Sequence, residues 1–581
     1  MGKKNHSLVK DFRGQLRNRL IVVSFLFLVF GAALVTRLFF LQILHHEDLV
    51  AQSERQYAGT TKIFYGRGTI YDRNMNELAR NIEVESIYVT PSEVIDRNHT
   101  AGLLASHLHL DRERIRKKIA SRKNFVWIKR KCNLAEVEKL RRLHLPGVGF
   151  VSEQKRFYPK RELAAGVTGF VGMDNQGLAG VEHFRHTMLK GTTIRQVMEK
   201  DARGRTIRTV NRTAGAQTGS HDVVLTLDEV IQFTTEYHLK RQMEKYHAKA
   251  GMAVVMDPYT GEIYAMAGLP RFNPNNYAAF PPQRWINSVV SNAYEPGSIF
   301  KPVVAAAAID SGMAKPGDIF FCENGKFRIG RVSIGEAAAH KFGWLTLRDI
   351  IAKSSNIGAI KIAQRLGKQR LYGYLRKFGF GQKSGIDLPG EAAGRLREVS
   401  QWSGLSLASI SFGHEIAVTP LQMVASLAAI ANGGTLMVPH ITKALLKNGK
   451  VDKTFPPRLV RRVISEKTSR QIIDILKTTV KNGTGAKAAI PGFDVAGKTG
   501  TAQKFDSATQ TYSKTNYLAS FIGFAPADAP KIVVLVMIDQ PRGSYWGGEV
   551  AAPVFREISR EVLRYLHVPY KGQRVYILNR A

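Results

Sequence analysis

The hydrophobic pattern of the chain begins with one long apolar stretch. Residues 20–36 contain no charged side chain, and after Arg37 the sequence is again apolar, apart from Gln42, as far as Leu44. Seventeen residues of helix span about 25 Å, which is close to the shortest length that crosses a bilayer. Arg37 can extend its guanidinium to the membrane surface while the helix continues. The pattern therefore predicts a membrane anchor helix over residues 20–44.

The charges before this stretch predict its orientation. Residues 1–19 carry six basic side chains and one acidic side chain, Asp11. Positively charged flanks remain in the cytoplasm, so we expect a cytoplasmic tail over residues 1–19 and the rest of the chain outside the membrane. A cleaved signal peptide is the alternative, because Ala32 and Ala33 are small enough for a cleavage site. The length of the apolar stretch favours the uncleaved anchor.

Residues 45–221 alternate short strand-like runs with charged segments. Between Asp111 and His144, two basic segments with the pattern of amphipathic helices flank the strand-like run 125–128. We interpret their charges as solvated helix faces, with a dedicated binding patch as the alternative. Because no arrangement of side chains in this region predicts catalysis, we expect a non-catalytic domain of mixed helices and strands.

The pattern changes again near residue 222. The strand-like run 223–227 leads into a helix, and the apolar runs 252–256 and 262–266 flank a turn of the β-hairpin type. Helical segments follow, and two further apolar strands are predicted at 517–523 and 531–538. A sheet built from both ends of a region with helices between them predicts an α/β sandwich. We place this domain at residues 222–567, with its last helix at 552–566 and a short basic tail at 568–581.

Composition limits the possible partners. Lysine and arginine exceed aspartate and glutamate by 37, which suggests a polyanionic partner: nucleic acid, anionic lipid or a cell-surface polymer. Export of most of the chain makes nucleic acid the least suitable of these, and a well-solvated surface is the simpler explanation for much of the excess. The two cysteines, Cys132 and Cys322, predict neither a disulfide framework nor a zinc site, and we expect both to be buried or incidental.

A candidate nucleophile lies at Ser298, in the sequence Ser298-Ile299-Phe300-Lys301. The preceding Pro-Gly pair and the following apolar run 303–309 predict a helix that starts near Ser298. A hydroxyl and an amine three positions apart share one face of a helical turn, where a neutral amine can take the serine proton. The pattern S-x-x-K occurs three times, and only this copy precedes an apolar helix. For the motif alone, an ordinary surface helix start remains the alternative.

Two further motifs complete the set. Ser354-Ser355-Asn356 is the only S-x-N in the chain and precedes a helical pattern. Lys498-Thr499-Gly500-Thr501 follows the strand-like run 493–497, whereas the similar Lys-Ser-Gly at 383–385 lies in a glycine-rich loop. S-x-x-K, S-x-N and K-T-G in this order form a joint signal for serine acyl transfer. It predicts that Ser298, Ser354 and Lys498 line a single cleft outside the membrane.

These motifs resemble those of the penicillin-binding protein and serine β-lactamase superfamily. The sequences at 67–74 and 177–182 are similar to pedestal motifs of class B penicillin-binding proteins, as are those at 156–159 and 257–266. The sequences at 273–275, 295–302, 353–358 and 497–504 resemble the division-specific branch. The resemblance implies the transpeptidase or β-lactamase α/β sandwich, with an N-terminal mixed pedestal and one transmembrane helix.

The resemblance also implies an activity: D,D-transpeptidation of peptidoglycan stem peptides at the division septum, inhibited by β-lactams. Ser298 would form the acyl-enzyme, and Lys301 would be the base, although the identity of the base is disputed in this superfamily. Ser354 would relay a proton to the leaving D-alanine, Asn356 would hold an amide of the donor peptide, and Lys498 would supply positive charge.

The remaining implications concern binding and location. Thr499, Gly500 and Thr501 would bind the terminal carboxylate of the donor, and the N–H groups of Ser298 and Thr501 would form the oxyanion hole. The implied partners are stem peptides, β-lactams, and division proteins of the inner membrane, including a glycosyltransferase of the shape, elongation, division and sporulation family. No metal or organic cofactor is implied. An elongation-specific transpeptidase, a β-lactamase or β-lactam sensor, and a non-enzymatic scaffold are the alternatives.

Overall fold

The computed structural model describes residues 4–64, 66–191, 193–200, 206–212, 220–506 and 511–570. The chain forms two compact units, each assembled from separate stretches of sequence. The smaller unit contains residues 1–65, 84–153 and 193–217, and the larger contains residues 66–83, 154–192 and 218–581.

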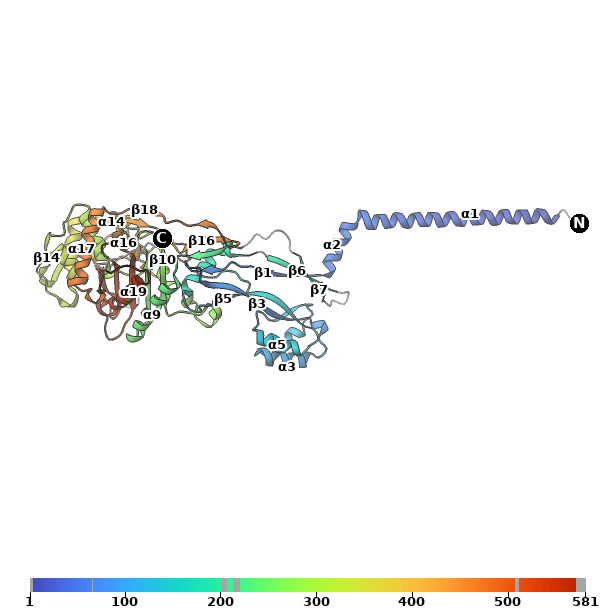
Figure 1. Ribbon diagram of the computed structural model, residues 1–581, viewed down its shortest axis with the longest axis horizontal. Helices are drawn as coiled ribbons and strands as arrows, with labels where there is room; N and C mark the ends of the chain where they lie inside the picture. The colour runs from blue at the N-terminus through green and yellow to red at the C-terminus, as the bar shows by residue number, and fades with distance from the viewer. Residues whose placement is uncertain are drawn as a thin grey trace, which may run out of the picture. The chain divides into compact units, whose positions relative to one another are not determined.

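The smaller unit begins with a long helix, α1 (Lys4–Phe39), which passes through a π-helical turn at Phe40–Leu44 into α2 (His46–Tyr57) (Figure 1). The segment Leu16–Leu44 is long and apolar enough to cross a membrane, and none of its most apolar window is buried. An apolar helix that contacts no protein on any side suits a lipid environment. The predicted apolar helix is confirmed, and it fits a membrane anchor.

The rest of the smaller unit has its own core. Helices α3 (Arg97–Leu108), α4 (Arg112–Ile119) and α5 (Leu134–Arg142) pack with β4 (Val126–Lys129) and with residues 87–89 of β3 (Glu77–Val89). The two predicted basic helices are confirmed as α4 and α5. Helix α4 buries Ile115 and Ile119, helix α5 buries Val137 and Leu140, and both expose most of their charges. A separate antiparallel sheet joins three strands in the order β1–β6–β7: Ala58–Phe64, Thr193–Lys200 and Thr206–Arg212.

The larger unit is built on a five-stranded antiparallel sheet with the order β10–β9–β21–β20–β19. Strands β9 (Ala250–Met256) and β10 (Ile263–Leu269) form the predicted hairpin. They are joined by strands from the C-terminal part of the chain, β19 (Ala496–Asp506), β20 (Thr511–Ala525) and β21 (Ile532–Asp539). The predicted α/β sandwich is confirmed.

Helices cover both faces of this sheet (Figure 1). Because successive side chains of a strand point to opposite faces, β9 sends Val254 to one layer and Val255 to the other. The Val255 layer includes α9 (Glu229–Lys245) and α19 (Ala552–Tyr565). The Val254 layer includes α11 (Lys301–Asp310), α13 (Asn356–Leu366) and α16 (Pro420–Ala431), and α11 and α16 are almost wholly buried.

A second sheet of the larger unit contains part of the sequence at 67–74, one of those that resemble pedestal motifs. It joins β17 (Lys450–Thr454), β16 (Thr442–Lys447), β8 (Asp222–Leu225) and β2 (Ile70–Tyr71) with the first part of β3 (Glu77–Val89), in that order. The sequence alone did not indicate that the motifs around it meet at one buried carboxylate.

That carboxylate belongs to Glu182, which is fully buried. Arg67 Nε donates to one of its oxygens at 2.5 Å, and Arg156 Nε donates to the other at 2.6 Å. The Tyr158 hydroxyl donates to the same carboxylate at 3.3 Å. Burial by itself would raise the pKa of Glu182, but Arg156 and Arg67 hold it below its ordinary value. The carboxylate is therefore charged and holds three separate segments together.

Replacing Glu182 with glutamine is expected to destabilise the protein by about 3–5 kcal/mol, because two buried guanidinium groups lose their counter-charge. The measurement is the denaturant midpoint of the full-length protein in detergent. Glu244→Gln is the matched control, since Glu244 pairs with Lys240 on the exposed face of α9 and its loss should change stability by less than about 1 kcal/mol. Equal midpoints for the two variants would contradict the assigned role of Glu182.

Candidate active site

The first motif forms the start of a buried helix. Residues Gly297–Phe300 make a 3₁₀ turn that runs directly into α11. Pro302 lies in the first turn of α11, where its missing N–H removes no intrahelical hydrogen bond. The predicted helix start near Ser298 is confirmed, and its α-helical part begins at Lys301. The burial of residues 302–309 fixes this end of the helix against the core.

The second motif links two helices. Ser354 follows α12 (Leu347–Lys353) with a left-handed backbone, at a φ of 62°. Such a conformation is uncommon for a residue other than glycine and persists only where the surrounding structure enforces it. Ser355 then caps α13, since its hydroxyl accepts the N–H of Gly358 at 2.9 Å. Helix α13 thus begins at Asn356, the third residue of the motif.

The third motif lies inside a strand rather than after one. The predicted strand at 493–497 is displaced: β19 begins at Ala496 and includes residues 498–501. The reason is its partner, because β20 pairs with β19 throughout this stretch, from Lys498 opposite Ile522 to Thr501 opposite Ala519. β19 is also the last strand of the sheet, so its free edge faces the Ser298 turn. A Cβ on Gly500 would lie 2.4 Å from Ser520 Oγ of β20 and 2.9 Å from the Ile299 side chain, so the close packing here requires glycine.

Hydrogen bonds join the three motifs. Lys301 Nζ donates to the Ser354 carbonyl at 2.6 Å, to Asn356 Oδ1 at 2.8 Å and to Ser354 Oγ at 3.3 Å. Lys498 Nζ donates to the same Ser354 Oγ at 2.8 Å. Among the described residues no hydrogen bond joins Ser298 to Lys301. Ser298 nevertheless lines the same pocket as Ser354, Thr499 and Thr501, with a volume of about 320 Å³.

Burial changes the protonation of both lysines. Burial lowers the pKa of Lys301 to about 7, against an opposing influence from Glu336. Burial, and secondly the neighbouring Lys301, hold the pKa of Lys498 well below its ordinary value. Near neutral pH Lys301 therefore has a large neutral fraction and can accept a proton. The two amines repel each other when both are charged, so the charge of one depends on that of the other.

Glu336 is a residue that sequence reasoning missed. It follows β13 (Val332–Gly335) and lines the pocket of Ser298. Its carboxylate accepts the N–H of Asn356 at 2.6 Å, the hydroxyl of Ser355 at 2.5 Å and the N–H of Ile357 at 3.3 Å. A carboxylate at a helix N-terminus satisfies free N–H groups and interacts well with the helix dipole. Glu336 therefore holds the second motif in place, and no sequence pattern distinguishes it from other glutamates.

Replacing Glu336 with glutamine is expected to slow acylation by about tenfold, because the start of α13 loses charge-assisted hydrogen bonds of about 1.5 kcal/mol or more. The pH at which acylation is half-maximal should also fall, since Glu336 raises the pKa of Lys301. Stopped-flow acylation by a chromogenic cephalosporin between pH 5 and about 9 measures both effects. Glu323→Gln, which removes the ion pair with Lys361 in the same segment, serves as the control and should leave both values unchanged. An unshifted pH midpoint in the Glu336 variant would disprove the coupling.

The rim of the site contains a second group that the motifs do not include. The Glu295 carboxylate accepts the N–H of Glu415 at 2.9 Å and the hydroxyl of Tyr512 at 3.0 Å. The ring of His414 packs beside Tyr512, and burial, with Lys301 as the second cause, lowers the pKa of His414 to about 4. This histidine is therefore neutral at physiological pH and does not add to the charge around Lys301.

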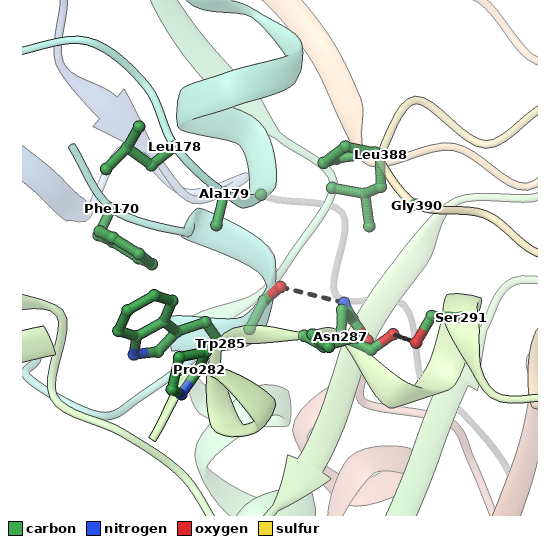
Figure 2. Close-up of a pocket in the computed structure, with 13 residues that line it drawn as sticks. Phe170, Leu178, Ala179, Pro282, Trp285, Asn287, Ser291, Leu388 and Gly390 are labelled. Atoms are coloured by element: carbon green, nitrogen blue, oxygen red, sulfur yellow. Dashed lines mark hydrogen bonds between the residues drawn. The ribbon is translucent and has the colours of Figure 1, made fainter. Parts of the chain in front are cut away.

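Another concave region of the larger unit has a different character. A pocket of about 510 Å³ is walled by Phe170, Trp285, Leu178 and Leu388, and the side chain of Asn287 donates to the Gly166 carbonyl at 3.1 Å (Figure 2). None of the residues that line it has an ionisable side chain. Acyl transfer needs a nucleophile and a base, so the pocket around Ser298 is the candidate active site.

The comparisons with known proteins agree with this geometry. Residues 251–560 match the family model of the penicillin binding protein transpeptidase domain, and residues 62–225 match that of the penicillin-binding protein dimerisation domain. Stage V sporulation protein D of Bacillus subtilis is 34% identical, over 96% of this chain and 87% of the relative. Peptidoglycan D,D-transpeptidase FtsI of Escherichia coli is 32% identical, over 92% of this chain and 90% of the relative.

Solved structures give the same result. The crystal structure of penicillin binding protein 3 from Mycobacterium tuberculosis, complexed with aztreonam, is 29% identical, with a TM-score of 0.69 over 88% of this chain and 98% of the neighbour. Two family models match in succession, and the relatives match over nearly the whole length of the chain. The chain therefore belongs to the penicillin-binding proteins, as a class B member of the FtsI type with a transpeptidase domain.

Proposed function

We propose that this peptidoglycan D,D-transpeptidase cross-links stem peptides through an acyl-enzyme on Ser298, and that β-lactams acylate the same residue. The observation that carries the proposal is the Ser354 hydroxyl, which lines the same pocket as Ser298 and accepts hydrogen bonds from two fully buried amines, Lys301 and Lys498. Membership of the family gives the reaction class, and the geometry supplies a residue for each step.

In the first half of the reaction, Ser298 Oγ attacks the carbonyl carbon of the penultimate D-alanine. The neutral form of Lys301, which is well populated near pH 7, takes the hydroxyl proton as the C–O bond forms. The bond to the terminal D-alanine then breaks, and its amine leaves with a proton. Ser354 Oγ lies within hydrogen-bond distance of both Lys301 and Lys498, which suits it to relay that proton.

The substrate is held by β19 and the Ser298 turn. Thr499 and Thr501 bind the terminal carboxylate, and Gly500 lets the strand lie close to Ile299. The N–H groups of Ser298 and Thr501 stabilise the negative oxygen of the tetrahedral intermediate, and each lowers the activation free energy by about 3 kcal/mol. Asn356 orients the donor peptide, while its Oδ1 accepts a hydrogen bond from the Lys301 amine. In the second half, the amine of a neighbouring stem peptide attacks the acyl-enzyme, and Ser298 regains its proton.

The protein is anchored in a membrane by its apolar N-terminal helix. We place residues 1–19 in the cytoplasm, the anchor at residues 20–44, the pedestal at 45–221, the transpeptidase domain at 222–567 and a tail at 568–581. The catalytic domain would then act outside the inner membrane, at the division septum, beside division proteins that include a membrane glycosyltransferase. If depletion of this protein makes cells grow as filaments, the division role is supported. If the depleted cells become round, the elongation alternative is supported.

The experiment that tests the proposed chemistry identifies the covalent intermediate. Full-length protein in detergent is mixed with a stem pentapeptide that ends in D-alanyl-D-alanine, and then digested and analysed by mass spectrometry. The expected result is an acyl adduct on Ser298, release of D-alanine, and a cross-linked dimer once an acceptor amine is added. An adduct on another residue would overturn the assignment of the nucleophile. Rapid hydrolysis of penicillin without cross-linking would favour a β-lactamase.

A further inference from the structure

The two threonine hydroxyls of the third motif each have a partner outside β19. Thr501 Oγ1 accepts the backbone N–H of Gly547 at 3.0 Å. Thr499 Oγ1 lies 2.7 Å from Thr484 Oγ1, and either hydroxyl can donate in that pair. All four of these residues line the pocket of Ser298. The direction in which each threonine hydroxyl donates therefore depends on its partner, Thr484 for Thr499 and Gly547 for Thr501.

The hydrogen bond between Thr484 and Thr499 can run in either direction, and the number of hydroxyl protons distinguishes the two arrangements. A hydroxyl has one proton to donate and two sites that accept. Thr501 uses an acceptor site for Gly547, which leaves its proton available to a ligand. When Thr499 donates to Thr484, it has no proton left for the pocket. When Thr484 donates to Thr499, the Thr499 proton is available, and a bound carboxylate, which only accepts hydrogen bonds, selects this second arrangement.

We propose that Thr484 is a positioning residue that donates its hydroxyl proton to Thr499 Oγ1 and so presents the Thr499 proton to the terminal carboxylate of the donor peptide. The inference rests on the proposed function and extends it to the recognition of the substrate terminus. Thr484 acts through Thr499, and the polarised chain of two hydroxyls strengthens the bond to the anion. Thr484 thereby favours ligands with a free carboxylate over the same ligands with a masked one.

The surrounding backbone holds Thr484 independently of its side chain. The residue follows α17 (Glu466–Asn482), and its N–H faces the Ala352 carbonyl at 3.4 Å. A Cβ on Gly548 would lie 2.6 Å from the Thr484 carbonyl oxygen, so this close approach requires the glycine. Because these contacts are made by the main chain, replacing the Thr484 side chain should leave the loop in place.

The test compares a fluorescent penicillin with its methyl ester, which lacks the carboxylate charge. Thr484→Val removes the hydroxyl but keeps the shape, and Thr484→Ser keeps the hydroxyl. We expect Thr484→Val to lower the second-order rate of Ser298 acylation by the free acid about tenfold, corresponding to about 1.4 kcal/mol, the value of one hydrogen bond. The methyl ester should react within about twofold of the wild-type rate, and Thr484→Ser should restore the preference for the free acid.

Thr478→Val is the matched control, because the half-buried Thr478 hydroxyl donates to the Asp474 carbonyl, accepts from Arg348 and does not line the pocket of Ser298. It should leave both rates unchanged, and Thr484→Ala provides the same comparison if valine prevents folding. If Thr484→Val slows acylation by the acid and by the ester equally, or slows neither, the inference is overturned. The proposed function still stands in that case, provided that the wild-type protein is acylated at Ser298. A wild-type protein that is not acylated at Ser298 would overturn both.

Discussion

The Ser298→Ala variant is expected to take up no fluorescent penicillin, whereas the wild-type protein is labelled within minutes. The alanine lacks the hydroxyl that we propose as the nucleophile, in the pocket that it shares with Ser354. Without a covalent bond, the label is lost when the protein is denatured. Fluorescence of the full-length protein after denaturing gel electrophoresis measures the effect, and we expect at least about a thousandfold reduction.

Ser152→Ala is the control for this experiment, because Ser152 begins another S-x-x-K sequence but lies within the strand β5 (Val148–Phe157). It should be labelled as strongly as the wild type. Persistent labelling of Ser298→Ala would refute the nucleophile, and loss of labelling in Ser152→Ala would indicate that the assay reports folding. If Ser298→Ala fails to support division in cells, the protein acts as an enzyme. If the variant supports division as well as the wild type, the protein acts as a scaffold.

The Lys301→Met variant is expected to be acylated about a thousandfold more slowly than the wild type. Methionine fills a similar volume but cannot take the Ser298 proton, and general-base catalysis contributes about 10²–10⁴ to such rates. The variant also loses the hydrogen bonds from Lys301 to the Ser354 carbonyl and to Asn356. Stopped-flow measurement of acylation by a chromogenic cephalosporin gives the rate.

The same amine determines the pH dependence. The neutral form of Lys301 is the base, so wild-type acylation should rise with pH through about 7 and level off above it. In Lys301→Met this rise should disappear. Lys504→Met is the control, because Lys504 lies on β19 but pairs with Asp539 at 2.9 Å, and it should keep the wild-type profile. A wild-type rate that does not change between pH 6 and about 8 would contradict the neutral-base mechanism.

The predictions that the structure bears out depend on short stretches of sequence. The anchor helix follows from an uninterrupted apolar stretch, and the β9–β10 hairpin from two apolar runs that flank a turn. The burial of residues 302–309 in α11 follows from their uniformly apolar sequence. Such patterns indicate a helix or a strand because the conformational preference of each residue agrees with the hydrophobic periodicity of its near neighbours in the sequence. The order of the three motifs likewise indicated the chemistry before any distance was available.

Two parts of the site could not be predicted, because they depend on contacts between distant segments. The placement of Lys498 within β19 follows from pairing with β20, which also displaces the start of the strand. Glu336 and Thr484 lie in segments with no recognisable motif, and they gain their roles only where the fold brings their oxygens to Asn356 and Thr499.

The sequence by itself determined the apolar N-terminal helix, the α/β class and the residues that we propose as reactive groups, since each follows from a local pattern or a motif. Only the tertiary structure decided the protonation of these groups and the residues that hold them in place. Burial sets the pKa of Lys301, and burial arises from packing among α11, α13 and the sheet. In the same way, Glu182 is an ordinary glutamate until the fold encloses it with Arg67 and Arg156. Solvation and hydrogen-bond geometry are properties of the assembled chain, and a linear pattern does not contain them.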